Sequence, residues 1–235
     1  MLDQPEKISP VLGREPAAER LAPRQILQLI SVVSSSADLN GAFRNLVDSL
    51  AMLYGNDQIS LFTPGKANLF TFFFSGGKEF INLENRTVKA GDGTLGYALK
   101  NLKSVLVEDY GNNKEFQPIQ AGIASELVIP ILFQSKLIAL LDLINQKPNS
   151  FATQDQTTLE ALAASLGGVL FTLQKTESLK ENVDREDRLN NMLTALSKSA
   201  TVEESVKTAA REIAKMPEIS QVSIFINPSQ KTSAK

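Results

Sequence analysis

Residues 88–171 constrain the fold more than any other part of the chain. They predict, in order, a glycine-rich turn, a short helix, a strand, a long loop, an apolar hairpin and a capped helix. The hairpin is the strongest of these signals, because residues 127–133 and 137–144 are almost continuously apolar and only a polar turn at 134–136 separates them. Runs of this kind are typical of central strands that are covered on both faces.

Two helices and a hairpin are predicted before this region. Apolar side chains recur at spacings of three and four over residues 24–36 and again over residues 39–53, and Asp38 between them is the predicted N-cap of the second helix. Residues 59–63 and 69–75 then predict the two strands of an antiparallel hairpin.

The second strand of this hairpin is strongly aromatic. Because side chains alternate along a strand, Phe70, Phe72 and Phe74 are predicted to share one face, with Phe73 on the other. Such a stripe either packs in the core or forms the floor of a ligand cavity, and both interpretations stay open. A further short strand is predicted over residues 80–83.

The stretch GDGTLG at residues 91–96 matches the G-x-G-x-x-G pattern of dinucleotide-binding turns. That fold requires a buried apolar strand just before the turn, whereas residues 85–89 are mostly polar. Two simpler interpretations remain: a tight turn that begins a short helix at Thr94, or a turn whose backbone N–H groups near Thr94 hold a small anion.

A single long helix is predicted over residues 154–199, with Thr153 as its cap. Apolar residues alternate at spacings of three and four up to Leu173, as in a coiled-coil seam, and charged residues then weaken the seam. Beyond Leu173 there is no domain on which apolar side chains can pack, so a partner helix is expected to cover them. The candidate dimer-interface residues are Ile26, Ile30, Leu166, Leu173, Leu179 and Val183.

Residues 188–226 resemble residues 25–63 without a gap. The offset is constant at 163 positions (221 − 58), so that QVSIF at 221–225 aligns with QISLF at 58–62 and Thr201 aligns with Asp38. A period of this length indicates tandem domains rather than a solenoid. The expected organisation is a disordered, proline-rich tail over 1–23, a domain over 24–174, a connecting helix over 175–200 and the truncated start of a second domain over 201–235.

The absence of Cys and His from all 235 residues excludes several kinds of site. Disulfides, thiol catalysis, Fe–S clusters, Cys/His zinc sites and Ser-His-Asp mechanisms each need one of these residues. A haem with a His or Cys axial ligand is excluded for the same reason. We expect no cofactor, no metal site and no catalytic residues, and we expect that the chain is not an enzyme.

The formal net charge of −2 gives no basic footprint for nucleic acid or for an anionic membrane. No apolar run reaches the roughly 20 residues that a membrane-spanning helix needs. Residues 1–10 lack the basic start and the apolar run of a signal peptide. We therefore expect a cytoplasmic location, with neither nucleic acid nor membrane as a partner.

Five motifs follow one another in a familiar order. They are AGDGTLGYALKN at 90–101, the strand SVLVED at 104–109, which ends in an acid, SELVIPI at 125–131, LIALLDLIN at 137–145, and a Phe-x-x-x-Asp pattern at the start of the last helix. With the elements around them, these motifs resemble a GAF domain over residues 25–174, and again over 188–226. The resemblance implies an α+β fold with an antiparallel β-sheet flanked by helices (GAF/PAS-like), followed by a long C-terminal connecting helix.

The resemblance also narrows the ligand class. In the cyclic-nucleotide branch of the family, a charged residue commonly follows an Asn and another follows an Asp. Here Gln146 follows Asn145 and Gln156 follows Asp155, which argues against a cyclic nucleotide as the ligand. Bilin-binding members attach the pigment through Cys, haem-binding members use His, and redox-active members use Cys. This chain contains neither residue, so those branches are excluded.

The family resemblance implies a sensory and dimerising module of a cytoplasmic signalling protein, with a pocket between the sheet and residues 94–124. Two hypotheses follow: a homodimer that senses a small molecule or nucleotide and transmits a signal through its helices, or a ligand-free structural dimerisation scaffold. Asp142 interrupts an apolar strand, so it must lie near an edge, be paired, or face a cavity. The candidate ligand contacts are Phe72, Phe74, Gly93, Thr94, Asp109, Phe116, Ser125 and Asp142.

Overall fold

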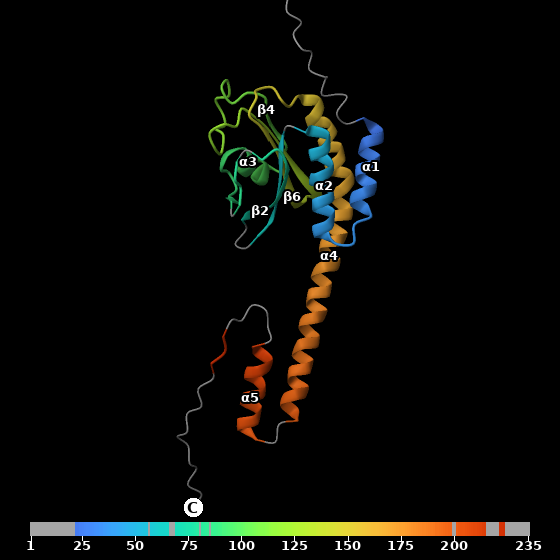
Figure 1. Ribbon diagram of the computed structural model, residues 1–235, viewed down its shortest axis with the longest axis vertical. Helices are drawn as coiled ribbons and strands as arrows, with labels where there is room; N and C mark the ends of the chain where they lie inside the picture. The colour runs from blue at the N-terminus through green and yellow to red at the C-terminus, as the bar shows by residue number, and fades with distance from the viewer. Residues whose placement is uncertain are drawn as a thin grey trace, which may run out of the picture. The chain divides into compact units, whose positions relative to one another are not determined.

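The structure of the chain is a computed structural model that describes residues 22–55, 57–65, 69–79, 81–84, 86–198, 201–214 and 221–223. The chain divides into two units, residues 1–175 and 176–235. The first unit holds an antiparallel sheet with helices on both faces, which confirms the predicted α+β fold (Figure 1). None of the described helices combines the length and the apolar character needed to span a membrane. The predicted tail over residues 1–23 lies almost entirely outside the described residues.

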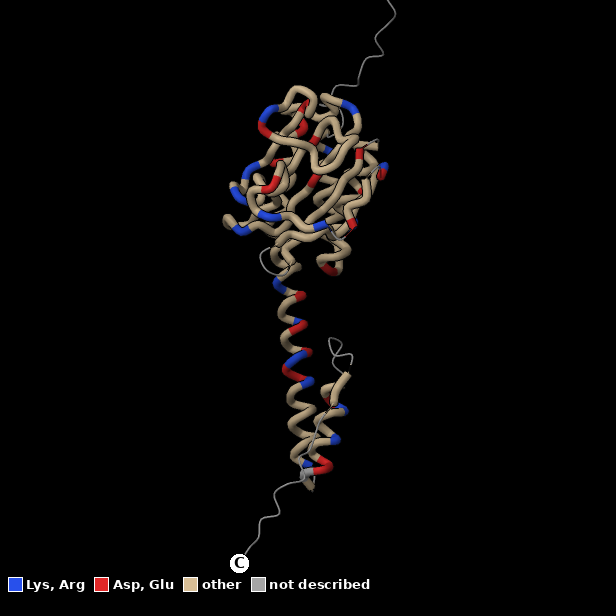
Figure 2. The backbone as a smooth tube through the Cα atoms, turned by 90° about the vertical axis from the view of Figure 1, so that its left-hand side faces the viewer, with Lys and Arg blue, Asp and Glu red and all other residues tan. Residues whose placement is uncertain are grey.

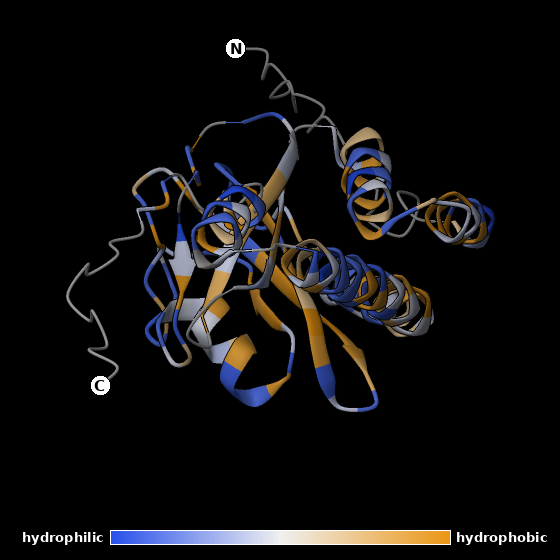
Figure 3. Cartoon of the chain, turned by 90° about the horizontal axis from the view of Figure 1, so that it is seen from below, coloured by the Kyte–Doolittle hydropathy of each residue, from blue (hydrophilic) through white to orange (hydrophobic). Residues whose placement is uncertain are grey.

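Six described strands form one sheet in the order β3-β2-β1-β6-β5-β4. Every neighbouring pair of strands is antiparallel. The strands are β1 (Gln58–Pro64), β2 (Phe70–Gly77), β3 (Thr87–Val88), β4 (Val105–Val107), β5 (Ser125–Phe133) and β6 (Lys136–Asn145). The apolar hairpin predicted from the sequence is thus the β5–β6 pair, at the centre of the sheet, and Figure 3 shows the hydrophobic colour of the strands there.

The turn of the β5–β6 hairpin is one residue shorter than the predicted polar turn at 134–136. Gln134 and Ser135 both adopt positive φ angles, 48° and 62°, and Lys136 already pairs with Phe133. Two successive positive φ angles match the right-handed twist of the flanking strands, which explains why the hairpin closes over two residues.

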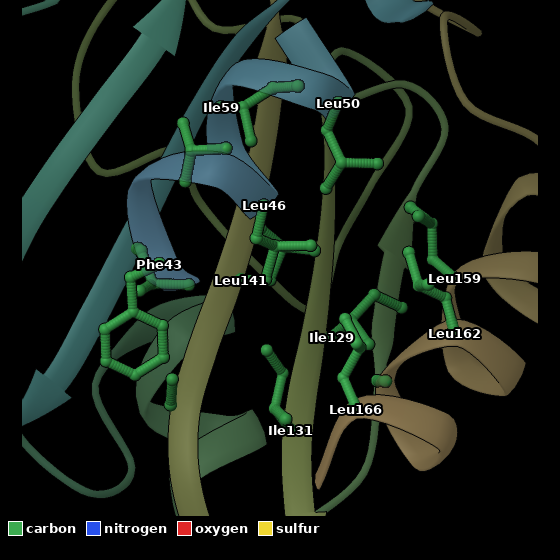
Figure 4. Packing of buried hydrophobic residues seen from close by; sticks show 14 of the residues in the cluster. Phe43, Leu46, Leu50, Ile59, Ile129, Ile131, Leu141, Leu159, Leu162 and Leu166 are labelled. Carbon is green, nitrogen blue, oxygen red and sulfur yellow. The ribbon is translucent and has the colours of Figure 1, made fainter. Parts of the chain in front are cut away.

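Three helices cover one face of the sheet: α1 (Pro23–Ser34), α2 (Leu39–Tyr54) and the first part of α4 (Thr153–Ser197). The predicted N-cap is confirmed, because Asp38 Oδ1 accepts a hydrogen bond of 2.7 Å from the Gly41 N–H. Figure 4 shows how the apolar residues of α2 and α4 meet those of β1, β5 and β6. The labelled residues there are Phe43, Leu46, Leu50, Ile59, Ile129, Ile131, Leu141, Leu159, Leu162 and Leu166.

The predicted cap of α4 is wrong. Thr153 is already the first residue of the helix, and the Asp155 carboxylate accepts a hydrogen bond of 2.9 Å from the Ala152 N–H. An acidic side chain in the first turn can reach back to the residue before the helix, and its negative charge also suits the helix N-terminus.

The opposite face of the sheet is covered by α3 (Gly93–Asn101) and by the irregular segment after β4, which surround a second apolar cluster. The strand predicted over residues 80–83 does not form in the part that is described. Ile81 and Leu83 are buried there in irregular backbone, and the Gln58 side chain bonds the backbone N–H and C=O of Ile81. A side-chain amide therefore takes the place of a strand partner, while the short strand β3 forms a few residues later.

The second unit contains the end of α4 and helix α5 (Val202–Ile213). Its element boundaries repeat those of the first unit at the sequence offset of 163 positions: α1 ends at Ser34 and α4 at Ser197, and α2 begins at Leu39 and α5 at Val202. Thr201 caps α5 by accepting a hydrogen bond of 3.2 Å from the Glu204 N–H. Asp38 caps α2 in the same way, by accepting from the N–H three residues later. The repeat predicts a strand over residues 221–226. Residues 221–223 are described and are not in a strand, residues 224–226 lie outside the described residues, and a second domain stays a prediction.

Candidate functional site

The side of the central strands that faces α3 carries two buried carboxyl groups. Glu126 on β5 is 0% exposed and Asp142 on β6 is 1% exposed, and both lie among apolar residues of the second cluster. Glu126 pairs with Ile144, and Asp142 stands two residues before it on the same strand. The two carboxyl groups are therefore diagonal neighbours on one face of the sheet, within reach of each other.

Three hydrogen bonds converge on Glu126. The Thr94 hydroxyl, in the first turn of α3, donates to Glu126 Oε1 at 2.8 Å, and the Tyr110 hydroxyl donates to Oε2. Asp142 supplies the third hydrogen bond from the neighbouring strand. The network thus joins α3, the segment after β4 and the two central strands around one carboxyl group.

Burial and mutual repulsion decide how this pair is protonated. Burial raises the pKa of Glu126, and the hydrogen bonds from Tyr110, Thr94 and Asp142 act in the opposite direction. Burial also raises the pKa of Asp142 well above its ordinary value, and the charge of Glu126 raises it further. Both shifts favour a proton on the pair, because two buried carboxylates this close to each other are costly to ionise together. Burial and the negative charge of Glu126 raise the pKa of Tyr110, so its phenol remains a hydrogen-bond donor.

Two further polar atoms beside this network have no hydrogen-bond partner among the described residues. They are Asp142 Oδ1 and Ser60 Oγ. Ser60 on β1 is 0% exposed and pairs directly with Asp142 across the β1–β6 ladder, so both side chains lie on the same face. Buried polar atoms are ordinarily hydrogen-bonded, and unpartnered ones are explained by strain, by a functional role or by a bound water or ion.

A pocket of about 510 Å³ adjoins the network at Thr94. Its walls come from β3, the glycine turn, the start of α3 and the loop at 115–119, where Phe116 packs edge-on against Tyr97 with ring centroids 5.4 Å apart. Gly91 and Gly93 adopt positive φ angles of 95° and 62° in the turn. A dinucleotide-binding turn requires a buried apolar strand just before it. The glycine turn here follows only the two-residue strand β3, so this interpretation is not supported.

Four of the predicted ligand contacts lie at this site. Thr94 and Asp142 belong to the hydrogen-bonded network, and Gly93 and Phe116 line the adjoining pocket. Two others lie elsewhere. Asp109 accepts hydrogen bonds from Gly111 and Asn112 within its own turn. Ser125 precedes Glu126 on β5, so it faces the other side of the sheet, and its hydroxyl donates to the Lys147 carbonyl.

The predicted common face for Phe72 and Phe74 is wrong. The β1–β2 ladder shifts register, so that Leu61 pairs with Phe74 and Phe62 with Phe72, and Phe73 is the extra residue of a β-bulge. As a result, Phe72 packs on the α3-facing cluster, whereas Phe73 and Phe74 both pack on the helix-covered cluster. Phe72 and Phe74 line a separate groove along β2 rather than the pocket beside Thr94.

The candidate dimer-interface residues fall into three groups. Leu166 is 0% exposed in the core of the first unit, so it is not accessible to a partner. Ile26, Ile30 and Leu173 pack partly against the same core. Leu179 and Val183, on the part of α4 that belongs to the second unit, are 64% and 56% exposed. Figure 2 shows that this part of the helix carries charges of both signs.

The comparison with known families agrees with this architecture. A family model for the GAF domain matches residues 38–170, more than half of the chain. The chain belongs to the GAF domain family. Among curated proteins, none matches it.

Solved structures share the GAF fold with this chain at low sequence identity. A free methionine-R-sulfoxide reductase from Neisseria meningitidis, in complex with its substrate, is 19% identical with a TM-score of 0.60, and the match covers 70% of this chain and 95% of that one. The GAF domain of a phosphoenolpyruvate-protein phosphotransferase from Coxiella burnetii is 18% identical with a TM-score of 0.56, over 66% and 96% of the two chains. The corresponding Acinetobacter domain is 18% identical with a TM-score of 0.53, over 65% and 94%.

Three residues of the GAF domain's polar network were not predicted from the sequence: Ser60, Tyr110 and Glu126. A signal for Glu126 existed, because it interrupts an apolar run as Asp142 does, and the register of the hairpin places the two on one face. Tyr110 lies in the long loop, where no periodicity indicates which side chain turns inward. The Ser60 side chain is small enough to fit an apolar strand without breaking its pattern.

Proposed function

We propose that this GAF domain is a non-enzymatic sensory module of a signalling protein and binds a small molecule on the α3-facing side of its sheet. The observation that carries the proposal is a pocket lined by Thr94, whose hydroxyl donates to the buried Glu126. On the same face of the sheet, Asp142 Oδ1 and Ser60 Oγ have no hydrogen-bond partner among the described residues. An unsatisfied buried polar atom costs about 1–3 kcal/mol of stability. A ligand that supplies the missing hydrogen bonds would offset that cost.

A binding role fits the residues better than a catalytic one. One structural relative is named as a reductase, and the fold alone does not distinguish a reductase from a sensor. Reduction of a sulfoxide by protein thiols needs Cys, and the 235 residues contain none. Within the described part of the chain, no group of three or more acidic side chains could hold a metal ion.

Helix α4 offers a route for the signal. It begins in the first unit, where Leu159, Leu162 and Leu166 pack in the core, and it continues without a break into the second unit. A ligand that binds one arrangement of α3 and the sheet more tightly than another would shift the populations of both arrangements. In the proposed sensor, α4 carries that difference to the next domain of the protein and to a partner subunit.

Thermal unfolding of the whole 235-residue chain across a panel of amines, amino acids, organic acids and nucleotides tests the proposal. A ligand that binds only the folded chain raises the melting temperature by mass action, so the rise should grow with ligand concentration. Thr94→Val, which removes the hydroxyl between the pocket and Glu126, should reduce the rise. Thr157→Val, the same change on an exposed turn of α4, should leave it intact. A rise that is equal in both variants would place the ligand elsewhere.

A second candidate function is a structural dimerisation scaffold, with a homodimer formed through the helices and no ligand. The observation that favours it is the exposure of Leu179, Val183, Leu189 and Leu193 along the second unit's part of α4. A particle of dimer mass whose melting temperature responds to no compound in the panel would favour the scaffold over the sensor.

A further inference from the structure

The outer edge of β2 is paired over only part of its length. The inner edge pairs with β1 along the whole strand, whereas β3 pairs with the outer edge only at Phe70 and Thr71. The Phe72 N–H donates to the Arg86 carbonyl at 2.9 Å, and after this residue no described strand continues the ladder. An unpaired strand edge presents a row of backbone N–H and C=O groups to which another strand can bind.

A groove of about 600 Å³ lies beside this unpaired edge. One wall is β2 from Phe72 to Ser75, and the other is formed by described residues between 79 and 84, the segment in which the predicted strand does not form. The Gln58 side chain bonds both the N–H and the C=O of Ile81, so this residue cannot present them to β2. The groove therefore occupies the position that a further strand of the sheet would take.

The strand itself carries little protection against pairing. Edge strands are commonly protected by charged side chains, by Pro or by a bulge. Strand β2 reads FTFFFSGG, so it has no charge and no Pro, and its residues from Phe72 to Phe74 are half-buried. Its bulge at Phe73 ends before Phe74, after which the strand pairs regularly with β1 up to Gly77. Beyond the bulge, the unpaired edge is thus uncharged and regular.

The groove is acidic. Glu79 and Glu84 are exposed in its wall, and none of its described lining residues is Lys or Arg. The Ser75 hydroxyl donates to Glu79, which holds this acid beside the strand. The Phe rings also suit a cation, because Arg44 already lies over the Phe74 ring, 4.7 Å from its centroid. Two copies of this edge would bring like charges together, so the charges favour a basic partner over a second copy of the chain.

We propose that the groove along β2 binds an extended segment of a partner protein in which basic and apolar side chains alternate. The backbone of that segment pairs with the outer edge of β2, which adds a strand to the sheet. Its apolar side chains pack on the half-buried Phe rings, and its basic side chains lie near Glu79 and Glu84. The groove shares no lining residue with the pocket at Thr94, so this inference does not depend on the proposed small-molecule site.

The test uses a short acetylated and amidated peptide in which Lys and Val alternate. Its binding to the whole chain is measured by the fluorescence anisotropy of an attached dye. A peptide with Glu in place of every Lys should bind at least about tenfold more weakly, because its charges repel the acids of the groove. Two further peptides carry a methyl group on the backbone nitrogen of every Val or of every Lys. Successive N–H groups of a strand point to opposite sides, so only one of these two should lose binding.

Amide hydrogen exchange locates the bound peptide on the chain. A peptide that adds to the edge of β2 takes up backbone N–H groups that otherwise face solvent. Exchange over residues 73–77 should therefore slow when the peptide binds, whereas exchange over α5, in the second unit, should not change.

Two matched pairs of substitutions test the role of the acids. Glu79→Gln together with Glu84→Gln removes both charges from the groove and should weaken the Lys peptide by about threefold to tenfold, the range for two exposed charge pairs. Glu181→Gln together with Glu186→Gln, at exposed positions of α4, changes the net charge of the chain by the same amount and should leave binding intact. Circular dichroism establishes that both double variants are folded.

Several results would overturn the inference. If both double variants weaken the peptide equally, only the net charge of the chain attracts it. If the two methylated peptides bind equally, or if the exchange of residues 73–77 does not change on binding, no strand is added to β2. Protection of these amides that grows with chain concentration, without peptide, would assign the edge to a second copy of the chain. Absence of binding at any peptide concentration refutes the inference as well, and none of these results bears on the small-molecule panel.

Discussion

Gly167 of α4 lies directly against the backbone of Leu132 on β5. A Cβ atom at position 167 would come within 2.0 Å of the Leu132 carbonyl oxygen and 3.0 Å of its carbonyl carbon. The absence of a side chain therefore allows α4 to approach the sheet at this point. The neighbouring Gly168 is less constrained, because a Cβ there would meet only the Phe133 ring, at 3.4 Å.

This difference gives a matched pair of substitutions in one helix. Gly167→Ala should destabilise the fold by about 1–3 kcal/mol, since α4 or β5 must move to make room. Gly168→Ala should instead stabilise it by about 0.5–1 kcal/mol, because Ala is a better helix former than Gly. Urea unfolding of both variants measures the two changes. Equal effects of the two substitutions would show that the close approach does not limit the packing of α4.

The close approach of α4 to the sheet at Gly167 could not be predicted from the sequence, because it joins residues that are far apart in the chain. The helices, the β5–β6 hairpin and the Asp38 cap follow from periodicity and capping rules, which depend on residues near one another in the chain. The bulge at Phe73 depends on how β1 pairs with β2, and the pairing of Glu126 with Asp142 depends on the register of two strands. Strand register is a tertiary property, so only part of the candidate site could be predicted.

The buried acid pair predicts an unusual dependence of stability on pH. Burial raises the pKa of Asp142, so the folded chain binds a proton that the unfolded chain has already lost. Stability should therefore fall as the pH rises above the ordinary carboxyl range, by up to ~1.4 kcal/mol per pH unit for one proton, until the folded-state pKa is passed. Asp142→Asn mimics the protonated acid and should remove this part of the dependence. Urea unfolding over a pH series checks this expectation, and parallel curves for the two proteins would contradict it.

The hydrogen bond between Tyr54 and Asp155 ties α2 to the start of α4. The Tyr54 hydroxyl donates to Asp155 Oδ1 at 3.1 Å, and both residues are buried. Tyr54→Phe should destabilise the first unit by about 1.5–3 kcal/mol, the range for a hydrogen bond to a charged group. Thermal unfolding measures the loss, and Tyr97→Phe, at a partly exposed ring of α3, is the control. A loss of similar size in the control would mean that the Tyr54 hydroxyl has no special role.

The proposed homodimer depends on apolar residues of α4 that the second unit leaves uncovered. Leu179 and Val183 are four positions apart, so they lie on one face of the helix, and both are more than half exposed. If two copies of this helix pair, Leu179→Glu together with Val183→Glu should place like charges in the interface and convert the dimer to a monomer. Met52→Glu removes an even more exposed apolar side chain, 85% exposed on α2, and should leave the dimer intact. Light scattering gives the molar mass of each protein, and a wild-type chain of monomer mass would refute the dimer.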